Sequence, residues 1–516
     1  MNKLFRMLSL VLIGVMLMTL VPAPASADVH RSDMRGVWVS TIFNLDYPGT
    51  KNNEKAQKDE YRTMLDQLQA AGINTVMVQV RPKADAFYPS AINPWSESLT
   101  GTQGRDPGYD PLAFMVEETH RRGMSFHAWL NPYRVTTGTT DVTTLADNHP
   151  ARLHPDWLIT HNGALYYNPE SEGVKKHVID TVAEIVTNYD VDGIHFDDYF
   201  YPSNYPLPEG ESRDGKIADA RRTTVNDMVA QVYQTIKRID SSVLFGISPM
   251  GIWKNKKSDP TGSATTGSEA YYSVFSDCRQ WIKAGTIDYI VPQIYWEIGF
   301  PAADYQTLVS WWSRETHGSP VTLYIGQAAY RDGVAAQMGQ QLNINQQYSN
   351  VKGSVFFRAK DIQNNRQGIA NQLKTFYSQK EAEALPSTHR VMMGGRLVPL
   401  QAYNINGSNY FKLRDLATVL SDTSARFNTR WDPVTETIHL ETGKAYLPVG
   451  GELASSAPST GKATMTTATL TLDGSLSYAG AFNILGNNYY KLRDIGSLTG
   501  FSVDWDPAES LITITP

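Results

Sequence analysis

The chain has 516 residues, 46 Lys and Arg against 52 Asp and Glu, and a formal net charge of −6. This charge excludes electrostatic capture of nucleic acid or of an anionic membrane, and the length predicts two or three domains. The single cysteine, Cys278, excludes an intramolecular disulfide.

The first 27 residues have the pattern of a secretory signal peptide. Lys3 and Arg6 precede an apolar run over residues 8–21, and the small residues Ala25-Ser26-Ala27 follow. The run is too short for a membrane-spanning helix, although a retained anchor is the alternative. We therefore expect cleavage after Ala27 and a secreted or cell-wall protein without further membrane contact.

Residues 31–380 alternate apolar β-type runs with amphipathic helical segments. The expected strands cover residues 36–41, 75–81, 125–131, 193–197, 243–248, 289–295, 322–327 and 354–358. The expected helices cover residues 55–71, 111–122, 174–188, 218–239, 275–284, 304–314, 334–348 and 367–378. Eight repeats predict an α/β fold of the (β/α)8 TIM-barrel type. A doubly wound sheet is the alternative, but no Gly-rich phosphate turn follows the first strand.

The fourth expected strand ends in two adjacent carboxylates, Asp197 and Asp198. Ionised groups at the end of a buried strand must be paired, solvated or used, and the carboxyl ends of barrel strands hold the active site. The sixth strand adds Glu297 at the same end. Other polar and aromatic residues expected at this mouth are Arg81, Asn131, Tyr133, His195, Tyr199, Gln293, Tyr295 and Trp296.

Carboxylates surrounded by aromatic rings and amides suit glycoside hydrolysis, in which one acid protonates the leaving oxygen. We expect Asp197 or Asp198 as the proton donor and Glu297 as its partner, with the remaining mouth residues positioning the sugar. Asp198 could instead be a rim salt bridge, Glu297 a solvated loop residue and His195 a satisfied core histidine. Neither HExxH nor CxxC nor a Gly-x-Ser-x-Gly elbow occurs, so we expect no metal and no cofactor.

Five segments carry a family resemblance: MRGVWVS (34–40), GINTVMVQVR (72–81), AWLNPY (128–133), DGIHFDDY (192–199) and PQIYW (292–296). With them the chain resembles the bacterial glycosyl-hydrolase-like family ten. The resemblance implies a (β/α)8 barrel with glycoside hydrolase activity. It also implies a polysaccharide substrate, an amino-sugar glycan of the cell wall and notably peptidoglycan strands stripped of their stem peptides.

A looser likeness to the family 18 chitinases concerns the same strand ends. Alignment of Asp192-Gly193 places Asp197 at the aspartate that steers the substrate acetamido group in that family. It places Tyr199 where the acid glutamate stands, and Trp296 at the aspartate of the sixth strand. Because the usual acid position holds a tyrosine, a non-catalytic glycan-binding barrel of the envelope is the alternative function.

The tail, residues 387–516, contains an internal repeat. NINGSNYFKLRDL (404–416) recurs as NILGNNYYKLRDI (483–495), and Trp431-Asp432-Pro433 recurs as Trp505-Asp506-Pro507. We expect two α+β repeats, at about 387–450 and 466–516, after a helical connector at 380–384 and with a linker at 453–467. They resemble the amine-oxidase N-terminal or "stalk" module. Their aromatic residues are expected to be mainly core, and cell-wall contact through them is a hypothesis.

Overall fold

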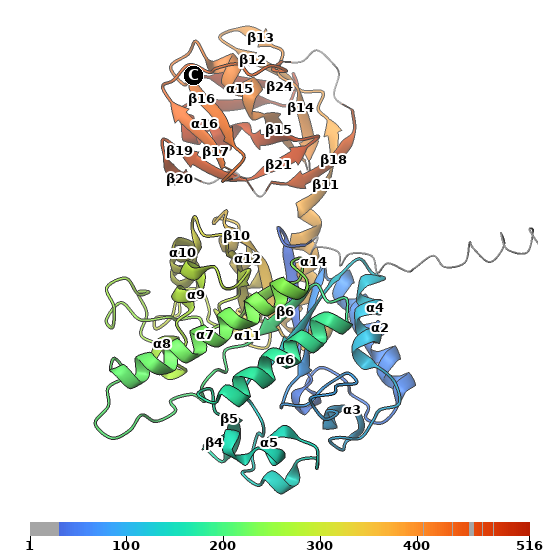
Figure 1. Ribbon diagram of the computed structural model, residues 1–516. Coiled ribbons are helices and arrows are strands. Elements are labelled where there is room, and N and C mark those ends of the chain that lie inside the picture. Colours follow the sequence, from blue (N-terminus) through green and yellow to red (C-terminus); the bar gives the residue numbers. More distant parts are fainter. Residues whose placement is uncertain (1–29, 406, 436, 454–458, 467, 478) are drawn as a thin grey trace, which may run out of the picture.

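The computed structural model describes residues 30–516 except 406, 436, 454–458, 467 and 478, so the predicted signal peptide lies outside the described residues. Two bodies are visible in Figure 1: a barrel wrapped by helices, and a β-rich C-terminal module reached through helix α14 (Ile369–Lys380). Within the described residues, no helix has both the length and the apolar character needed to cross a membrane.

Eight parallel strands close into one barrel, which confirms the predicted fold. In barrel order the strands are β1 (Met34–Val39), β2 (Thr75–Arg81), β3 (Ser125–Leu130), β6 (Gly193–Phe196), β7 (Leu244–Ile247), β8 (Tyr289–Ile290), β9 (Thr322–Ala328) and β10 (Val351–Phe357). The main helices between them are α2 (Glu54–Ala70), α4 (Pro111–His120), α6 (Glu172–Asn188), α7 (Lys216–Ile239), α9 (Cys278–Ala284), α10 (Tyr305–Thr316), α11 (Asp332–Ala336) and α12 (Met338–Asn345).

Two local features depart from the expected pattern. The strand expected over 289–295 ends at Ile290, because Pro292 has no N–H to donate to a ladder. Gln293 rejoins the sheet only through isolated bridges to Met250 and Gly326. An unpredicted hairpin, β4 (Leu158–His161) and β5 (Ala164–Tyr167), lies between β3 and α6.

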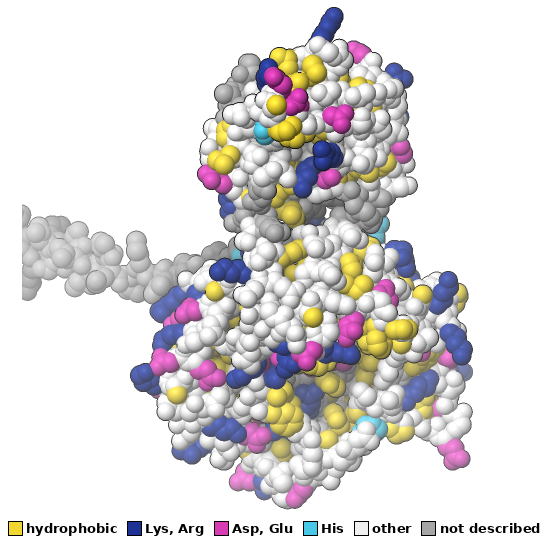
Figure 2. Space-filling view, turned by 180° about the vertical axis from the view of Figure 1, so that it is seen from behind, with side chains coloured by type: hydrophobic (Ala, Val, Ile, Leu, Met, Phe, Trp, Pro, Cys, Tyr) yellow, Lys and Arg dark blue, Asp and Glu magenta, His cyan; other side chains and the backbone are white. Residues whose placement is uncertain are grey.

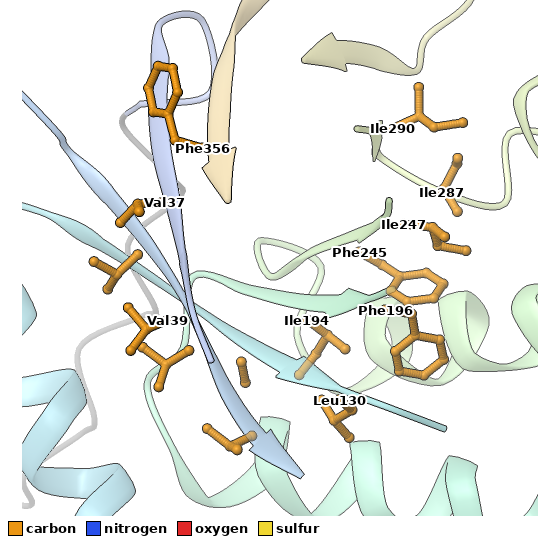
Figure 3. Close-up of a cluster of buried hydrophobic side chains, with 14 of the residues drawn as sticks. Val37, Val39, Leu130, Ile194, Phe196, Phe245, Ile247, Ile287, Ile290 and Phe356 are labelled. Carbon is orange, nitrogen blue, oxygen red and sulfur yellow. The ribbon is translucent and has the colours of Figure 1, made fainter. Parts of the chain in front are cut away.

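Side chains alternate between two environments along the barrel strands. Those that face the helices form the apolar layer drawn in Figure 3, which includes Val37, Ile194, Phe196 and Phe245. Those that face the barrel axis include large polar rings and glycines, and the apolar ones among them form a separate cluster. The interior cluster contains Met34, Trp38, Met77, Trp129, Leu244, Tyr289, Val291, Tyr324 and Val355.

Glycines make room for the rings inside the barrel. A Cβ on Gly246 would lie 2.1 Å from the ring of Tyr289, and one on Gly193 would lie 2.6 Å from Nδ1 of His127. Each glycine therefore opens the space that a large side chain of a neighbouring strand fills. This arrangement places a layer of polar rings directly beneath the carboxyl ends of the strands.

The C-terminal module is built from two interlocked repeats. Six strands form a small closed barrel in the order β11 (Glu381–Pro386), β14 (Ala402–Ile405), β15 (Ser408–Lys412), β22 (Asn487–Lys491), β21 (Ala481–Ile484) and β18 (Gly461–Met465). The other strands are β12 (Arg390–Met393), β13 (Arg396–Val398), β16 (Phe427–Asp432), β17 (Thr437–Thr442), β19 (Thr469–Leu472), β20 (Ser475–Ser477), β23 (Ser502–Asp506) and β24 (Leu511–Thr515). Each repeat also contributes one helix, α15 (Leu413–Leu420) or α16 (Leu492–Thr499).

The outer strands show how the repeats interlock. The first hairpin of each repeat pairs in parallel with the last hairpin of the other: β12 pairs with β24, and β19 pairs with β17. Neither repeat can therefore complete its sheets alone.

The connector expected to be helical at 380–384 is instead a strand. β11 follows α14 directly and pairs antiparallel with β18 and β14. The Glu-Ala alternation of this segment suits a helix locally, but pairing with two neighbours decides the outcome. In the expected linker, residues 461–465 form β18, whereas 454–458 and 467 lie outside the described residues. Each repeat thus begins one strand earlier than the sequence indicated.

Candidate active site

A buried network of polar rings lies just beneath the mouth of the barrel. Trp38 Nε1 donates to His195 Nε2 over 3.1 Å, and His195 Nδ1 is 3.1 Å from the hydroxyl of Tyr289. That hydroxyl is 2.8 Å from His127 Nδ1. Because an indole can only donate, His195 carries its proton on Nδ1 and donates to Tyr289. Burial holds the pKa of His195 well below its usual value, so it is a neutral core histidine.

A chain of amides leads from the first strand loop to Asp197. Gln79 Oε1 accepts from the backbone N–H groups of Thr41 and Ile42, each over 3.0 Å. The nitrogen of Gln79 therefore faces Asn131 Oδ1 and donates to it, and Asn131 Nδ2 in turn donates to Asp197 Oδ2. Two backbone donors thus fix both amide orientations and present an N–H to the carboxyl group of Asp197.

Asp197 is 5% exposed. Burial raises its pKa to about 7, with the opposing charge of Arg134 as the next largest influence and the neighbouring Asp198 raising the pKa further. Its Oδ1 accepts from the backbone N–H of Tyr199 over 3.3 Å. This carboxyl group therefore exchanges its proton near neutral pH, as an acid catalyst must.

Asp198 turns to the opposite side of β6. Its Oδ1 accepts from Gln293 Nε2 over 3.1 Å, and the same nitrogen donates to the carbonyl of Ser248 over 2.9 Å. Burial raises the pKa of Asp198 as well. The two carboxyl groups are thus held by different strands, Asp197 from β3 and Asp198 from the segment after β8, and Asp198 adds to the charge that raises the pKa of Asp197.

Tyr199 and Arg134 form an exposed edge beside the two carboxyl groups. Tyr199 is 40% exposed, and the guanidinium carbon of Arg134 lies 4.4 Å from its ring centroid. The charge of Asp198, followed by burial, raises the pKa of Tyr199 to about 12. The phenol therefore stays neutral, and its ring and hydroxyl are available to a ligand.

Tyr295 and Trp296 belong to an aromatic wall after β8. The ring of Tyr295 lies 6.1 Å from that of Tyr330 and 6.2 Å from that of Phe357. Burial, followed by the charge of Asp198, raises the pKa of Tyr295 well above its usual value. Trp296 is half-buried, and its carbonyl accepts from a side chain of α12.

Arg81 and Tyr133, predicted to contact the sugar, lie behind the mouth instead. Arg81 is buried, donates to the carbonyls of Asn131 and Pro132 over 2.7 and 3.2 Å, and lies 3.3 Å from His177 on α6. A register shift after Gln79 in the pairing of β2 with β3 turns Arg81 toward the helices. Tyr133 is 1% exposed in the apolar layer. Both residues thus support the strand ends from outside the barrel.

Glu297 contacts the start of α11. Its half-buried side chain lies against Gly333 at the start of α11, where a Cβ on that glycine would be 2.1 Å from Glu297 Oε1. Across the described residues, no hydrogen bond or ion pair connects Glu297 to Asp197 or Asp198. The carboxyl group that perturbs Asp197 is its neighbour Asp198.

Three residues of the site were absent from the predicted set: Gln79, Arg134 and Ser248. Gln79 lies on β2 in phase with Met77 of the interior cluster, so alternation along that strand indicates it. Arg134 lies beyond the end of β3 and after Pro132, where strand alternation no longer applies. Ser248 contributes twice: its hydroxyl lies 3.0 Å from His195 Nε2, and its backbone carbonyl accepts from Gln293, a contact for which a sequence gives no signal. Among the described residues, no group of three or more His, Cys, Asp or Glu could hold a metal ion.

Comparison with known proteins identifies the family. The family model described as Glycosyl hydrolase-like 10 matches residues 33–348. Glycosyl hydrolase YngK of Bacillus subtilis (strain 168) is 45% identical over 401 residues, which cover 74% of this chain and 78% of that protein. Glycosyl hydrolase DigH of Escherichia coli (strain K12) is 36% identical over 375 residues, which cover 65% of this chain and 85% of that protein.

Among solved structures, the PgaB (BpsB) glycoside hydrolase domain from Bordetella bronchiseptica matches with 12% identity and a TM-score of 0.47, over 67% of this chain and 99% of that domain. The family match spans most of the barrel and includes the strand ends that carry Asn131, Asp197, Asp198 and Gln293. The chain is a glycoside hydrolase and belongs to the glycosyl hydrolase-like 10 family.

Proposed function

We propose that the protein is a secreted glycoside hydrolase that cleaves O-glycosidic bonds in an amino-sugar glycan of the cell wall, most specifically peptidoglycan strands without stem peptides. The family membership supports the reaction. The signal-peptide pattern of residues 1–27 supports export, and the resemblance of the strand-end motifs supports the substrate. The polysaccharide is then the principal partner of the barrel.

The observation that carries the reaction is the state of Asp197. A carboxyl group with a pKa of about 7 is about half protonated at neutral pH, so it can give its proton to the leaving glycosidic oxygen. Asn131 holds this group in place. Asp198 is the second carboxylate in this mechanism: it stabilises the positive charge that develops on the sugar ring. It replaces Glu297, which lies against α11.

The aromatic residues at the mouth supply the binding surface for the sugar. Tyr199, Tyr295 and Trp296 present rings that can stack on pyranose faces, and the guanidinium of Arg134 beside Tyr199 can donate to hydroxyl or acetamido oxygens. Gln293 orients Asp198 rather than the sugar, because its side-chain nitrogen donates to Asp198 Oδ1 and to the carbonyl of Ser248.

The test compares three glycans: peptide-free peptidoglycan strands, chitin oligomers and deacetylated glucosamine polymers. The full-length protein is incubated with each, and products are identified by mass spectrometry. We expect cleavage of the peptide-free strands, a loss of at least about 100-fold in Asp197→Asn and in Asp198→Asn, and retained activity in the matched variant Glu297→Gln. Undiminished cleavage by both aspartate variants would refute the assigned chemistry. Cleavage confined to the deacetylated polymers would refute the substrate.

A further inference from the structure

A cleft of about 1150 Å³ separates the barrel from the C-terminal module. On the barrel side it is lined by residues at the amino ends of β1 and β10, such as Arg35 and Gly353, and by Tyr377 of α14. Asp197 lies at the opposite, carboxyl end of the same parallel strands. Figure 1 shows the module above the barrel, on the side away from the β4–β5 hairpin. The cleft is therefore a place distinct from the catalytic mouth.

A partly exposed indole lines the module side of this cleft. Trp431 on β16 is 42% exposed, and across the described residues no other ring packs on it. Its counterpart in the second repeat, Trp505 on β23, is 39% exposed but has the ring of His389 at 4.5 Å in an edge-on contact. The two indoles are thus about equally exposed, and they differ in the edge-on ring contact that only Trp505 makes among the described residues.

The repeat itself explains this difference. His389 immediately precedes β12, the strand that pairs with β24 beside Trp505. The corresponding position immediately before β19, which pairs with β17 beside Trp431, is Ala468. Ala468 also lines the cleft. An alanine has no ring to place beside the indole, so among the described residues Trp431 lacks the edge-on contact that His389 makes with Trp505.

Most of the charged residues that line the cleft are basic: Arg35, Lys352, Lys412, Arg414 and Arg430. The acidic ones are Asp33 and Asp494. Arg35 is 3.5 Å from Asp33, and Lys412 is 3.9 Å from Asp415. Within the described part of the chain, Arg414 and Arg430 form no ion pair. This basic lining contrasts with the net charge of −6 of the whole chain, so the cleft favours an anionic ligand.

Amide side chains complete the lining. Asn483 on β21 and Asn487 and Asn488 on β22, beside the turn that joins these strands, all border the cleft. Their contacts are local to the turn: Asn487 Nδ2 donates to the carbonyl of Leu485 and Asn483 Nδ2 to Asn488 Oδ1, each over 3.3 Å. Each amide nitrogen has a second hydrogen to donate, and Asn487 Oδ1 can accept. Such groups suit the hydroxyl and acetamido groups of a sugar.

We propose that this cleft is a second binding site, for a carboxylate-bearing amino-sugar strand. The identity of the strand rests on the proposed function, because removal of the stem peptide leaves a free lactyl carboxylate on each muramic acid residue. Trp431 stacks on a pyranose face, Arg414 and Arg430 pair with the carboxylates, and the asparagines bind the neutral polar groups. A phosphate-bearing wall polymer of open-chain alcohols would use the arginines but offers no ring to the indole.

The experiment uses the full-length chain with Asp197→Asn, so that the ligand is not consumed, and titrates it calorimetrically with peptide-free glycan oligomers. We expect two sites, one of which weakens about tenfold or more in Trp431→Ala, the scale of a lost aromatic stacking contact. Trp505→Ala is the matched control and leaves both sites unchanged. Ala468→His places a ring beside Trp431, as His389 does beside Trp505, and weakens the same site without removing the indole.

Two further comparisons identify the ligand. In the double variant that combines Arg414→Gln and Arg430→Gln, we expect the cleft to lose its preference for peptide-free strands over neutral chitin oligomers. Binding should also become less dependent on salt concentration. Unchanged binding in both Trp431→Ala and Ala468→His, or equal losses in Trp505→Ala, would overturn the proposal. So would tighter binding of a glycerol-phosphate polymer that Trp431→Ala leaves unaffected. Failure of the proposed function is seen separately, as missing hydrolysis products with the unmodified protein.

Discussion

The protonation of Asp197 gives the sharpest prediction. A carboxyl group whose pKa rises from 3.8 to about 7 on folding binds its proton more tightly in the folded protein. At low pH the carboxyl group is protonated in both the folded and the unfolded protein, so its raised pKa does not lower the free energy of unfolding. The cost to stability grows as the pH rises above 3.8 and reaches its full value above about 7. Asp197→Asn removes this titration, so the variant should gain stability over the unmodified protein as the pH rises.

The size of the effect follows from the shift in pKa. Three pKa units correspond to about 4 kcal/mol in the free energy of unfolding, of which about 2–3 kcal/mol falls between pH 5 and pH 8.5. The variant also loses something at every pH, because Asp197 accepts from both Asn131 and Tyr199 and an amide has only one acceptor oxygen. That loss of about 1–2 kcal/mol is independent of pH and cancels when the two pH values are compared.

The assay is urea unfolding of both proteins at pH 5 and pH 8.5. The difference between their free energies of unfolding should shift by about 2–3 kcal/mol in favour of Asp197→Asn at the higher pH. Asp147→Asn is the control, because the Asp147 side chain is 94% exposed. A difference that stays constant with pH would show that Asp197 titrates at its usual pKa, and the argument for its role as proton donor would fail with it.

Three other substitutions test the surroundings. Arg134→Gln removes the main charge that lowers the pKa of Asp197, so the alkaline limb of the pH–rate profile should move to higher pH; an unmoved limb would contradict this. Gln79→Leu leaves two backbone N–H groups without an acceptor, so the free energy of unfolding measured in urea should fall by about 2–4 kcal/mol. A loss below about 0.5 kcal/mol would refute the role of this amide. Gly246→Ala should lower the melting temperature by several degrees, because the added Cβ would overlap the ring of Tyr289. Gly138→Ala is the control, since a Cβ there meets no other atom within 4 Å. Equal melting temperatures for the two variants would refute the packing argument.

The barrel could be predicted because its strands are short apolar runs separated by amphipathic helices. Each of the eight predicted ranges overlaps an observed strand, and β2 has the predicted bounds. The C-terminal module was less predictable. β11 has alternating Glu and Ala, and only its pairing with β18, about 80 residues later, makes it a strand. Sequence periodicity contains no information about such a partner.

The active-site residues also divide into those that a strand pattern predicts and those that it does not. Asp197, Asp198 and Asn131 were recognisable because each directly follows a buried strand. Arg81 turns toward the helices because a register shift in the pairing of β2 with β3 interrupts the alternation along β2. The prediction for Glu297 rests on alternation beyond β8, but this strand ends before Pro292, so the side chains after it need not alternate as in a strand.

The neutral state of His195 depends on contacts that no local pattern contains. Trp38 comes from β1 and Tyr289 from β8, whereas His195 lies on β6. These partners meet only because the sheet closes into a barrel. A sequence can therefore place this histidine on a strand, but only the folded barrel assigns its proton.

The arrangement of the two modules has a consequence for how a polymer is handled. Binding at the cleft and at the mouth engages opposite ends of the barrel strands, which are about 20 Å apart for strands of six or seven residues. Figure 2 shows a narrow waist between the modules, and in the barrel below it a hollow where hydrophobic and charged side chains gather. The cleft would hold one stretch of glycan while the mouth meets another, so the second contact forms at a raised effective concentration. Trp431→Ala should therefore slow the cleavage of long strands but leave the cleavage of short oligosaccharides unchanged. Equal rates on long strands would show that the cleft does not assist catalysis.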